Sequence, residues 1–138
     1  RVTKVACPAN EVRELIRSGS YTKAYKTVSQ QVQLHELEAA WHLLAAFLAQ
    51  KLRRVENADS HYRRAIYLDR KSVAAHYLYA AFLVERQVDA KAQKECEVAL
   101  KLLSSAAEEV IELPAETLSV LELKQRIQKL NQQVNESR

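Results

Sequence analysis

Glycine and proline are almost missing from this chain, which contains one glycine and two prolines in 138 residues. Sandwiches, barrels and hairpins need turn residues in quantity, and doubly wound folds need glycine where a strand turns into a helix. The scarcity argues against all-β and Rossmann-type folds, and it excludes a glycine-rich phosphate loop. The chain is rich instead in Ala, Leu, Glu, Gln, Lys and Arg, which favour helices. We therefore expect an all-α protein.

The net charge and the cysteines indicate which kind of partner and which cellular compartment to expect. The net charge is +4, and basic residues are interleaved with acidic ones, so we expect no nucleic acid partner. Cys7 and Cys96 form neither a disulfide framework nor a metal pair, which predicts a reducing, cytoplasmic compartment. No apolar run approaches the length of a membrane span, so we expect no membrane insertion. Because the chain starts with Arg and lacks methionine, we expect a fragment of a longer protein.

An internal repeat organises most of the chain. Three alanines recur at a spacing of 34 residues, at Ala24, Ala58 and Ala92. Four residues after each of them stands a larger side chain: Val28, Tyr62 and Cys96. A small residue lets two helices approach closely, and a bulky residue one turn later fills the space beside it. The pattern predicts the second helix of a repeating helix–turn–helix unit.

The first helices of two units also match, at a slightly different spacing. Residues 45–48, Ala-Ala-Phe-Leu, recur as residues 80–83, which is a spacing of 35. This alignment places His76, Tyr79, Ala80 and Leu83 at the positions of Trp41, Leu44, Ala45 and Leu48. It predicts one extra residue in the turn of the second unit, within residues 51–55.

The expected helices cover residues 10–18, 20–34, 36–52, 55–69, 72–87 and 89–103. Gly19 supplies a left-handed residue between the first two helices, and Ser20 follows it as a helix cap. Asn10, Ser72 and Asp89 stand where three other helices should begin. We divide the chain into a lead-in (1–9), three repeats (10–104), a connector (105–118) and a C-terminal helix (119–138). Residues 104–114 either prolong the sixth helix or form a strut.

The C-terminal helix is predicted to be amphipathic. Ser119 and Glu122 form a capping-box pattern. One face of the helix carries Val120, Leu123, Ile127, Leu130 and Val134. A single helix with such a stripe is unstable in water, and terminal repeats of an array need a cap. We expect it to cover the sixth helix at Leu100 and Leu103 in a monomer. A two-stranded zipper between two chains is the alternative.

With these spacings the chain resembles the tetratricopeptide repeat family, whose W-x2-L-G-x2-Y pattern is similar to residues 41–48. The resemblance covers residues 10–104 and implies a right-handed α-solenoid whose first helices line a concave groove that binds extended peptides. The implied groove residues are His42, Leu43, Ala46, Ala49 and Gln50, then Ala74, Tyr77, Leu78, Ala81, Val84 and Glu85. The Lys, Asn and Arg of the family's carboxylate clamp are missing there. The groove then takes an apolar peptide, is filled by the chain's own tail, or is packing surface.

One subset of the family is more similar than the rest. Residues 58–69 and 75–87 resemble the repeats that follow chemoreceptor glutamate methyltransferases. Residues 116–123 resemble the closing motif D-G-L-[ST]-x-x-E-L, with Glu116 for Asp and Thr117 for Gly. This implies a regulatory module of an S-adenosylmethionine-dependent enzyme, which meets a chemoreceptor, a response regulator or its own catalytic domain. A stand-alone adaptor, a secretion-type chaperone and a coiled-coil assembly factor stay open as alternatives.

No arrangement of residues in this chain predicts catalysis. The histidines His35, His42, His61 and His76 lack the spacing and third ligand of a zinc site. We therefore expect no metal, no cofactor and no enzymatic activity, and we interpret Cys96 as a core residue. A basic patch is formed by Arg63, Arg64, Arg70 and Lys71. It either complements the dipole at a helix end or docks an acidic partner surface.

Overall fold

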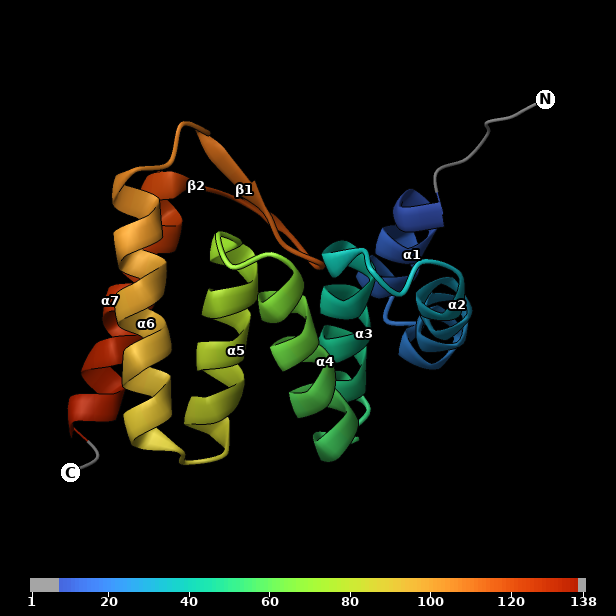
Figure 1. Ribbon diagram of the computed structural model, residues 1–138, viewed down its shortest axis with the longest axis horizontal. Coiled ribbons are helices and arrows are strands. Elements are labelled where there is room, and N and C mark those ends of the chain that lie inside the picture. The colour runs from blue at the N-terminus through green and yellow to red at the C-terminus, as the bar shows by residue number, and fades with distance from the viewer. Residues whose placement is uncertain (1–7, 137–138) are drawn as a thin grey trace.

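The structure, a computed structural model, describes residues 8–136. Six helices come first: α1 (Pro8–Arg17), α2 (Tyr21–Leu34), α3 (Ala39–Lys51), α4 (Val55–Leu68), α5 (Val73–Glu85) and α6 (Asp89–Ser104). A hairpin of β1 (Val110–Glu112) and β2 (Thr117–Ser119) follows, and α7 (Val120–Glu136) ends the described part (Figure 1). The helical class is confirmed, although the hairpin adds two short strands.

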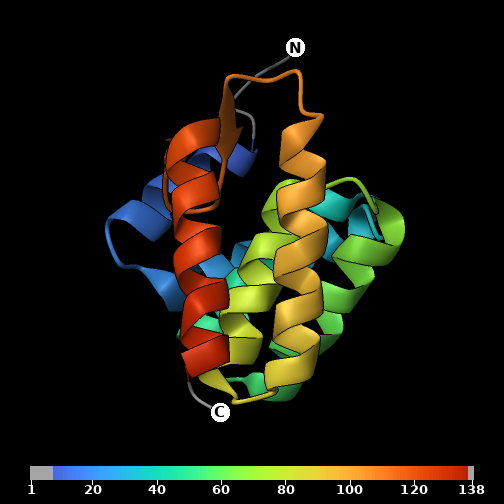
Figure 2. The same ribbon diagram turned by 90° about the vertical axis from the view of Figure 1, so that its left-hand side faces the viewer.

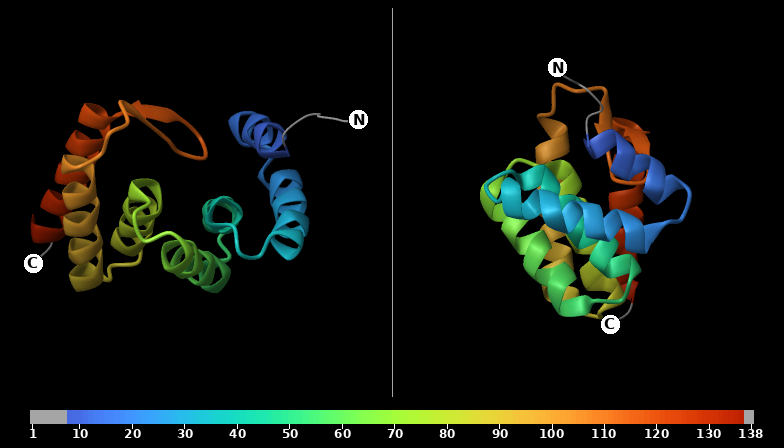
Figure 3. Two further views of the ribbon diagram at one scale, coloured as in Figure 1. Left: turned by 45° about the horizontal axis from the view of Figure 1, so that its top comes forward. Right: turned by 90° about the vertical axis from the view of Figure 1, so that its right-hand side faces the viewer.

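The helices form a right-handed solenoid of three pairs, which confirms the expected architecture. The pairs are α1 with α2, α3 with α4, and α5 with α6, and each packs on the next along the chain. The array is curved, with α1, α3 and α5 on its inner side and α2 and α4 on its outer side (Figure 3). The hairpin lies over the inner side and reaches from the end of α6 towards α1 and α3 (Figures 1 and 3).

The turn within each pair follows one pattern, repeated every 34 residues. Gly19, Arg53 and Gln87 have positive φ angles of 81°, 61° and 62°. The residue that follows each of these three donates its amide to the carbonyl five residues earlier, as Ser20 N–H does to Leu15 at 2.8 Å. This is the Schellman motif, which satisfies the last carbonyls of a helix. Only the first turn has the glycine that such a conformation favours.

The repeat spacing of the first helices is 34 residues, so the predicted spacing of 35 is wrong. His42 and His76 make equivalent bonds, because each donates from Nε2 to the carbonyl six residues earlier, in Glu36 and in Arg70. Each also meets, through Nδ1, the residue 19 positions later in its own unit. Residues 51–55 therefore contain no extra residue. The matching tetrapeptides lie one residue out of phase, which rotates them by about 100° on the helix.

Local capping signals predicted some helix ends and missed others. The hydroxyl of Ser72 accepts a hydrogen bond from Ala75 N–H at 3.1 Å, as expected of a cap. Ser20 occupies the cap position of α2, but its side chain makes no capping bond. The predicted caps Asn10 and Asp89 are wrong, since α1 already begins at Pro8 and Asp89 is the first residue within α6.

The connector forms a hairpin, so both expectations for residues 104–114 are wrong. Ile111 pairs with Leu118 in an antiparallel ladder, and Leu113 N–H donates to Glu116 at 2.8 Å to close the turn. The side chains of Leu113 and Leu118 are buried, and with the half-buried Ile111 they pack on the inner side of the array. The hairpin is thus held by its own apolar face.

The C-terminal helix α7 packs on α6 and α5, as the expected cap does (Figure 2). Ser119 and Glu122 form the predicted capping box, with bonds of 3.0 and 3.1 Å between each side chain and the other residue's amide. Leu123 and Ile127 have no exposed surface and share a cluster with Leu103. The apolar stripe therefore drives the docking of α7 on the last repeat.

Candidate functional site

The inner side of α5 presents a row of partly exposed apolar residues. Tyr77, Leu78, Ala81 and Val84 are half-buried, and Glu85 is exposed at the end of the row. Leu78 packs against three clusters of buried residues: one within α1, α2 and α3, one mainly within α3, α4 and α5, and one within α5, α6, α7 and the hairpin. It therefore lies where the repeats meet. The structure thus leaves five of the predicted groove residues of the third unit accessible: Tyr77, Leu78, Ala81, Val84 and Glu85.

The predicted groove residues on α3 are mostly in the core. Ala46 and Ala49 have no exposed surface, and His42 is 5% exposed, so these three cannot line an open groove. Leu43 and Gln50 are half-buried and do reach the inner side.

The error on α3 comes from the spacing of 35. At the true spacing of 34, Leu43 and Gln50 are equivalent to Tyr77 and Val84, and these two do reach the inner side. Leu44 and Phe47, the equivalents of Leu78 and Ala81, are buried. The spacing of the three alanines Ala24, Ala58 and Ala92 contained this information. Applied to the first helices as well, it would have selected Leu43 and Gln50 and left out His42, Ala46 and Ala49.

A hydrogen-bonded chain holds α3, α4 and α5 together at one end of the inner side. Tyr62 donates its hydroxyl proton to Gln50 Oε1 at 2.6 Å, and Gln50 Nε2 donates to Glu85 Oε2 at 3.2 Å. Burial, with a contribution from the charge of Glu85, raises the pKa of Tyr62 above its ordinary value. The hydroxyl therefore remains a donor, and Gln50 and Glu85 serve the contact between repeats.

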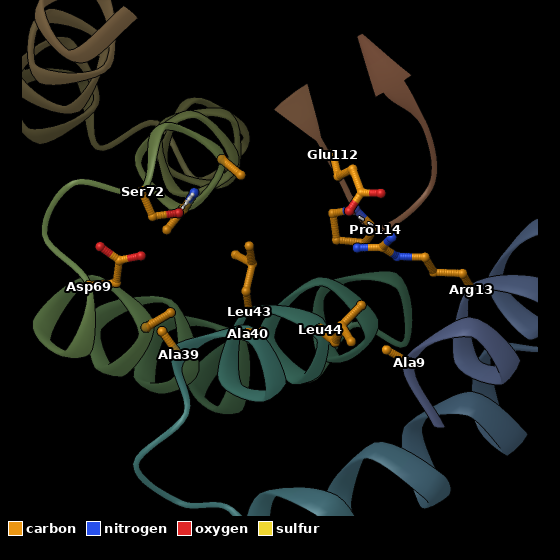
Figure 4. A pocket seen from close by; sticks show the side chains of 13 residues that line it. Ala9, Arg13, Ala39, Ala40, Leu43, Leu44, Asp69, Ser72, Glu112 and Pro114 are labelled. Atoms are coloured by element: carbon orange, nitrogen blue, oxygen red, sulfur yellow. Dashed lines mark hydrogen bonds and ion pairs between the residues drawn. The ribbon is translucent and has the colours of Figure 1, made fainter. Parts of the chain in front are cut away.

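A cavity of about 230 Å³ lies at the other end, beneath the hairpin (Figure 4). We call it the hairpin pocket. Its walls come from α1, α3, the end of α4, the start of α5 and the hairpin. Of residues 8–136, six alanines line it, together with two leucines: Ala9, Ala39, Ala40, Ala65, Ala74, Ala75, Leu43 and Leu44. The small side chains leave the space open, and the predicted groove residues Leu43 and Ala74 belong to it.

Polar groups stand at the rim of the hairpin pocket. Arg13 Nη1 of α1 pairs with Glu112 Oε2 of β1 at 3.1 Å, and Pro114 lies beside them (Figure 4). The Nε–H of Arg13 is buried and finds no acceptor within residues 8–136. Across the pocket, Asp69 accepts the amide of Lys71 at 3.2 Å. The pocket is thus apolar within and charged at its mouth.

The four histidines are held by hydrogen bonds rather than by a shared metal geometry. His42 Nδ1 lies 3.1 Å from His61 Nδ1, and His76 Nδ1 lies 2.5 Å from Glu95 Oε1. His35 Nδ1 lies 2.6 Å from Glu38. Within residues 8–136, no three His, Cys, Asp or Glu side chains gather in a metal-binding group.

The equivalent histidine pairs differ in electrostatics. Burial, and then the charge of His42, lowers the pKa of His61. Burial would also lower the pKa of His76, but its bonds to Glu95 and to the Arg70 carbonyl, with the charges of Glu95 and Asp69, raise it overall. Both nitrogens of His76 face acceptors, whereas Nδ1 of His42 faces Nδ1 of His61, so only one of these two nitrogens can donate to the other.

Three of the four basic residues line two different hollows. Arg63 and Arg64 line one beside His61 and Tyr67. Lys71 lines another, near the hairpin, and Arg70 binds His76 through its carbonyl. Docking of an acidic partner surface at these residues stays a prediction.

Two other expectations concern a cysteine and the membrane. Cys96 is fully buried, and burial raises the pKa of its thiol to about 11, which is consistent with a packing role. Cys7 lies outside the described residues. Among residues 8–136, every helix is too short or too polar to cross a bilayer.

Comparisons with known proteins identify the fold of this chain. Neither a protein-family model nor a curated protein matches the sequence. Among solved structures, the type III secretion translocator chaperone SycD of Yersinia enterocolitica has a TM-score of 0.80 at 17% identity, over 94% of this chain and 82% of that one. SycD in complex with a peptide of the translocator YopD has a TM-score of 0.79 at 16% identity, over 98% of both chains.

A eukaryotic domain is similarly close in shape. The TPR2B domain of yeast Sti1, solved as a complex with pHsp70, has a TM-score of 0.78 at 17% identity and covers 96% of this chain and 100% of the domain. Identities this low carry the fold and nothing finer. The chain therefore has the fold of the tetratricopeptide repeat proteins.

Proposed function

We propose that this chain is a protein-interaction module that binds an extended, apolar peptide segment of a partner protein along its inner side. The observation that carries the proposal is the half-exposed apolar row on α5, at Tyr77, Leu78, Ala81 and Val84, beside Leu43 of α3. Apolar surface gathered on a concave face is typical of helical repeat proteins that bind other chains. SycD and the Sti1 domain, which share the fold, were solved with bound partners.

The biological setting has two candidates. One is the regulatory module of a bacterial chemoreceptor methyltransferase in the cytoplasm, where the partner is a chemoreceptor, a response regulator or the catalytic domain. Its support is the sequence resemblance of residues 116–123 to the closing motif of such proteins. The other is a secretion-type chaperone, supported by the similarity to SycD over 98% of both chains. In both settings the chain binds another protein, and any catalysis belongs to a different domain or protein.

The binding proposal is tested with a displayed library of random 12-residue peptides and calorimetry on the selected sequences. We expect enrichment of apolar residues and a Kd in the micromolar range. Ala81→Glu places a charge on the inner side, and we expect it to abolish binding. Ala90→Glu, at an exposed position of α6, is the matched control and should bind as the wild type does. Equal binding by both variants would refute the inner side as the site.

The two settings are separated by a second binding experiment. The chain is titrated with the cytoplasmic fragment of a chemoreceptor and with a peptide from a translocator of type III secretion. Binding to the receptor fragment that Ala81→Glu abolishes supports the regulatory module. The same result with the translocator peptide supports the chaperone.

A further inference from the structure

We infer that the hairpin pocket receives one large apolar side chain, Leu or Phe, of the bound peptide, and that a Lys or Arg next to this side chain pairs with Asp69. The inference rests on the proposed function and adds the sequence preference of the partner. It uses three properties of the pocket: its size and lining, an unused donor, and its unbalanced charge.

The size of the pocket fits one large side chain. Its volume is about 230 Å³, and a protein cavity of roughly 150 Å³ already holds a benzene molecule. The interior is formed by alanines and by Leu43 and Leu44, so more of its surface is apolar than polar. The hairpin supplies one wall through Glu112 and Pro114, so the pocket exists only because the connector folds over the inner side.

An unused donor marks the place of the peptide main chain. Arg13 Nη1 is bound to Glu112, while its Nε–H is buried without an acceptor among residues 8–136. A buried donor left unsatisfied is costly, and native structures rarely keep one. Once the bound peptide displaces the side chains that cover this donor, one of its main-chain carbonyls at the pocket mouth would supply the acceptor. A peptide presents such carbonyls whatever its side chains are.

The charge at the mouth selects the neighbouring residue. Among residues 8–136, the lining carries one cation, Arg13, which already pairs with Glu112, and two carboxylates, Glu112 and Asp69. Asp69 receives a backbone amide, and its charge contributes to the raised pKa of His76, but within residues 8–136 it forms no ion pair. A Lys or Arg next to the apolar anchor of the peptide would form an ion pair with the Asp69 carboxylate. The partner segment is therefore apolar and basic, unlike the peptides with a free carboxylate that a carboxylate clamp binds.

Filling the pocket tests the inference. Ala40 is exposed and is the second residue of α3, so Ala40→Leu occupies the pocket without overpacking the core. Ala90 is exposed and is the second residue of α6, which makes Ala90→Leu the matched control. With a peptide selected from the library on the wild type, we expect Ala40→Leu to weaken binding by about 10- to 100-fold and Ala90→Leu to leave it unchanged.

A double-mutant cycle separates pocket binding from an indirect effect. Replacing the apolar anchor of the peptide by Ala should weaken binding to the wild type to a similar extent, and should add little on Ala40→Leu. Asp69→Asn should remove the preference for a basic neighbour and its dependence on salt. Thermal unfolding of Ala40→Leu, expected at the wild-type midpoint, verifies that the fold is kept.

The failures are distinguishable. If no library peptide binds the wild type, the proposed function and this inference both fail. If a peptide binds and Ala81→Glu abolishes its binding, but Ala40→Leu and Asp69→Asn bind as the wild type does, the peptide lies elsewhere on the inner side. That result would overturn the pocket and leave the proposed function standing.

Discussion

Gln87, two residues after the last residue of α5, has a left-handed backbone conformation with a φ of 62°. A side chain at this conformation is strained, and Gly19 meets the same requirement in the first unit without strain. We predict that Gln87→Gly raises the free energy of unfolding by about 0.5–1 kcal/mol. Urea unfolding measures the change. Arg86→Gly is the control, since Arg86 is exposed and has an ordinary φ of −85°, and this change should destabilise. Loss of stability in both variants would contradict the account.

The histidine pairs predict opposite responses to pH. The pKa of His61 is lowered on folding, so the unfolded chain binds its proton more readily, and stability is lost as the pH falls through about 6.5. The pKa of His76 is raised, so its contribution is complete below about 6.5 and is lost as the pH rises through the folded pKa.

Exchanging the partners of the two histidines tests this difference. His61→Glu gives His42 the carboxylate partner that Glu95 provides to His76, so we predict a smaller loss of stability between pH 7.5 and 5.5 than in the wild type. Glu95→His should have the reverse effect. Urea unfolding at both pH values is the measurement. Identical pH dependence in all three proteins would show that these pairs do not govern the response.

At the scale of elements, α7 depends on the capping box at its first turn. Ser119 and Glu122 exchange bonds at 3.0 and 3.1 Å, and these bonds lower the pKa of the exposed Glu122. We predict that Ser119→Ala lowers the free energy of unfolding by about 1 kcal/mol. Ser105→Ala, at an exposed residue just beyond α6, is the control and should change it little. Equal effects would mean that the cap does not support α7.

The apolar stripe of α7 makes a stronger prediction. Ile127 is fully buried and Leu130 is half-buried against the core around α6. The double variant Ile127→Asp with Leu130→Asp should lower the unfolding midpoint of the whole array, equally at every protein concentration. Gln128→Asp with Lys129→Asp, on the exposed face, should cost far less. A folded array and a midpoint that depends on concentration only in the wild type would instead indicate a zipper between two chains.

The sequence predicted the elements that carry local signals. Six helices and α7 follow from helix propensity, the 34-residue repeat and the stripe from Val120 to Val134. The hairpin was missed because β1 and β2 are three residues each, too short to show alternation, and their pairing is a tertiary contact. The α3 side of the groove was misassigned because the match between residues 45–48 and 80–83 outweighed the spacing of the alanines. The hairpin pocket depends on both features, and so no local pattern could indicate it.

At the scale of the whole molecule, the hairpin joins parts that a solenoid normally keeps apart. Each repeat of such an array contacts only its neighbours. Here Glu112 pairs with Arg13 of α1, and Glu116 forms a bidentate pair with Arg126 of α7 at 2.7 and 3.2 Å. The connector therefore links the first helix to the last one and forms one wall of the inner side.

The central claim is that the inner side, and no other surface, binds the partner. Titration of the isotopically labelled chain with a library-selected peptide, followed by NMR of the backbone amides, tests it most directly. We predict that the largest shifts map to α3 and α5 around Leu43, Leu78 and Ala81, and to the hairpin at Glu112. Shifts confined to the outer helices α2 and α4, or to the basic residues Arg63 and Arg64, would contradict the account.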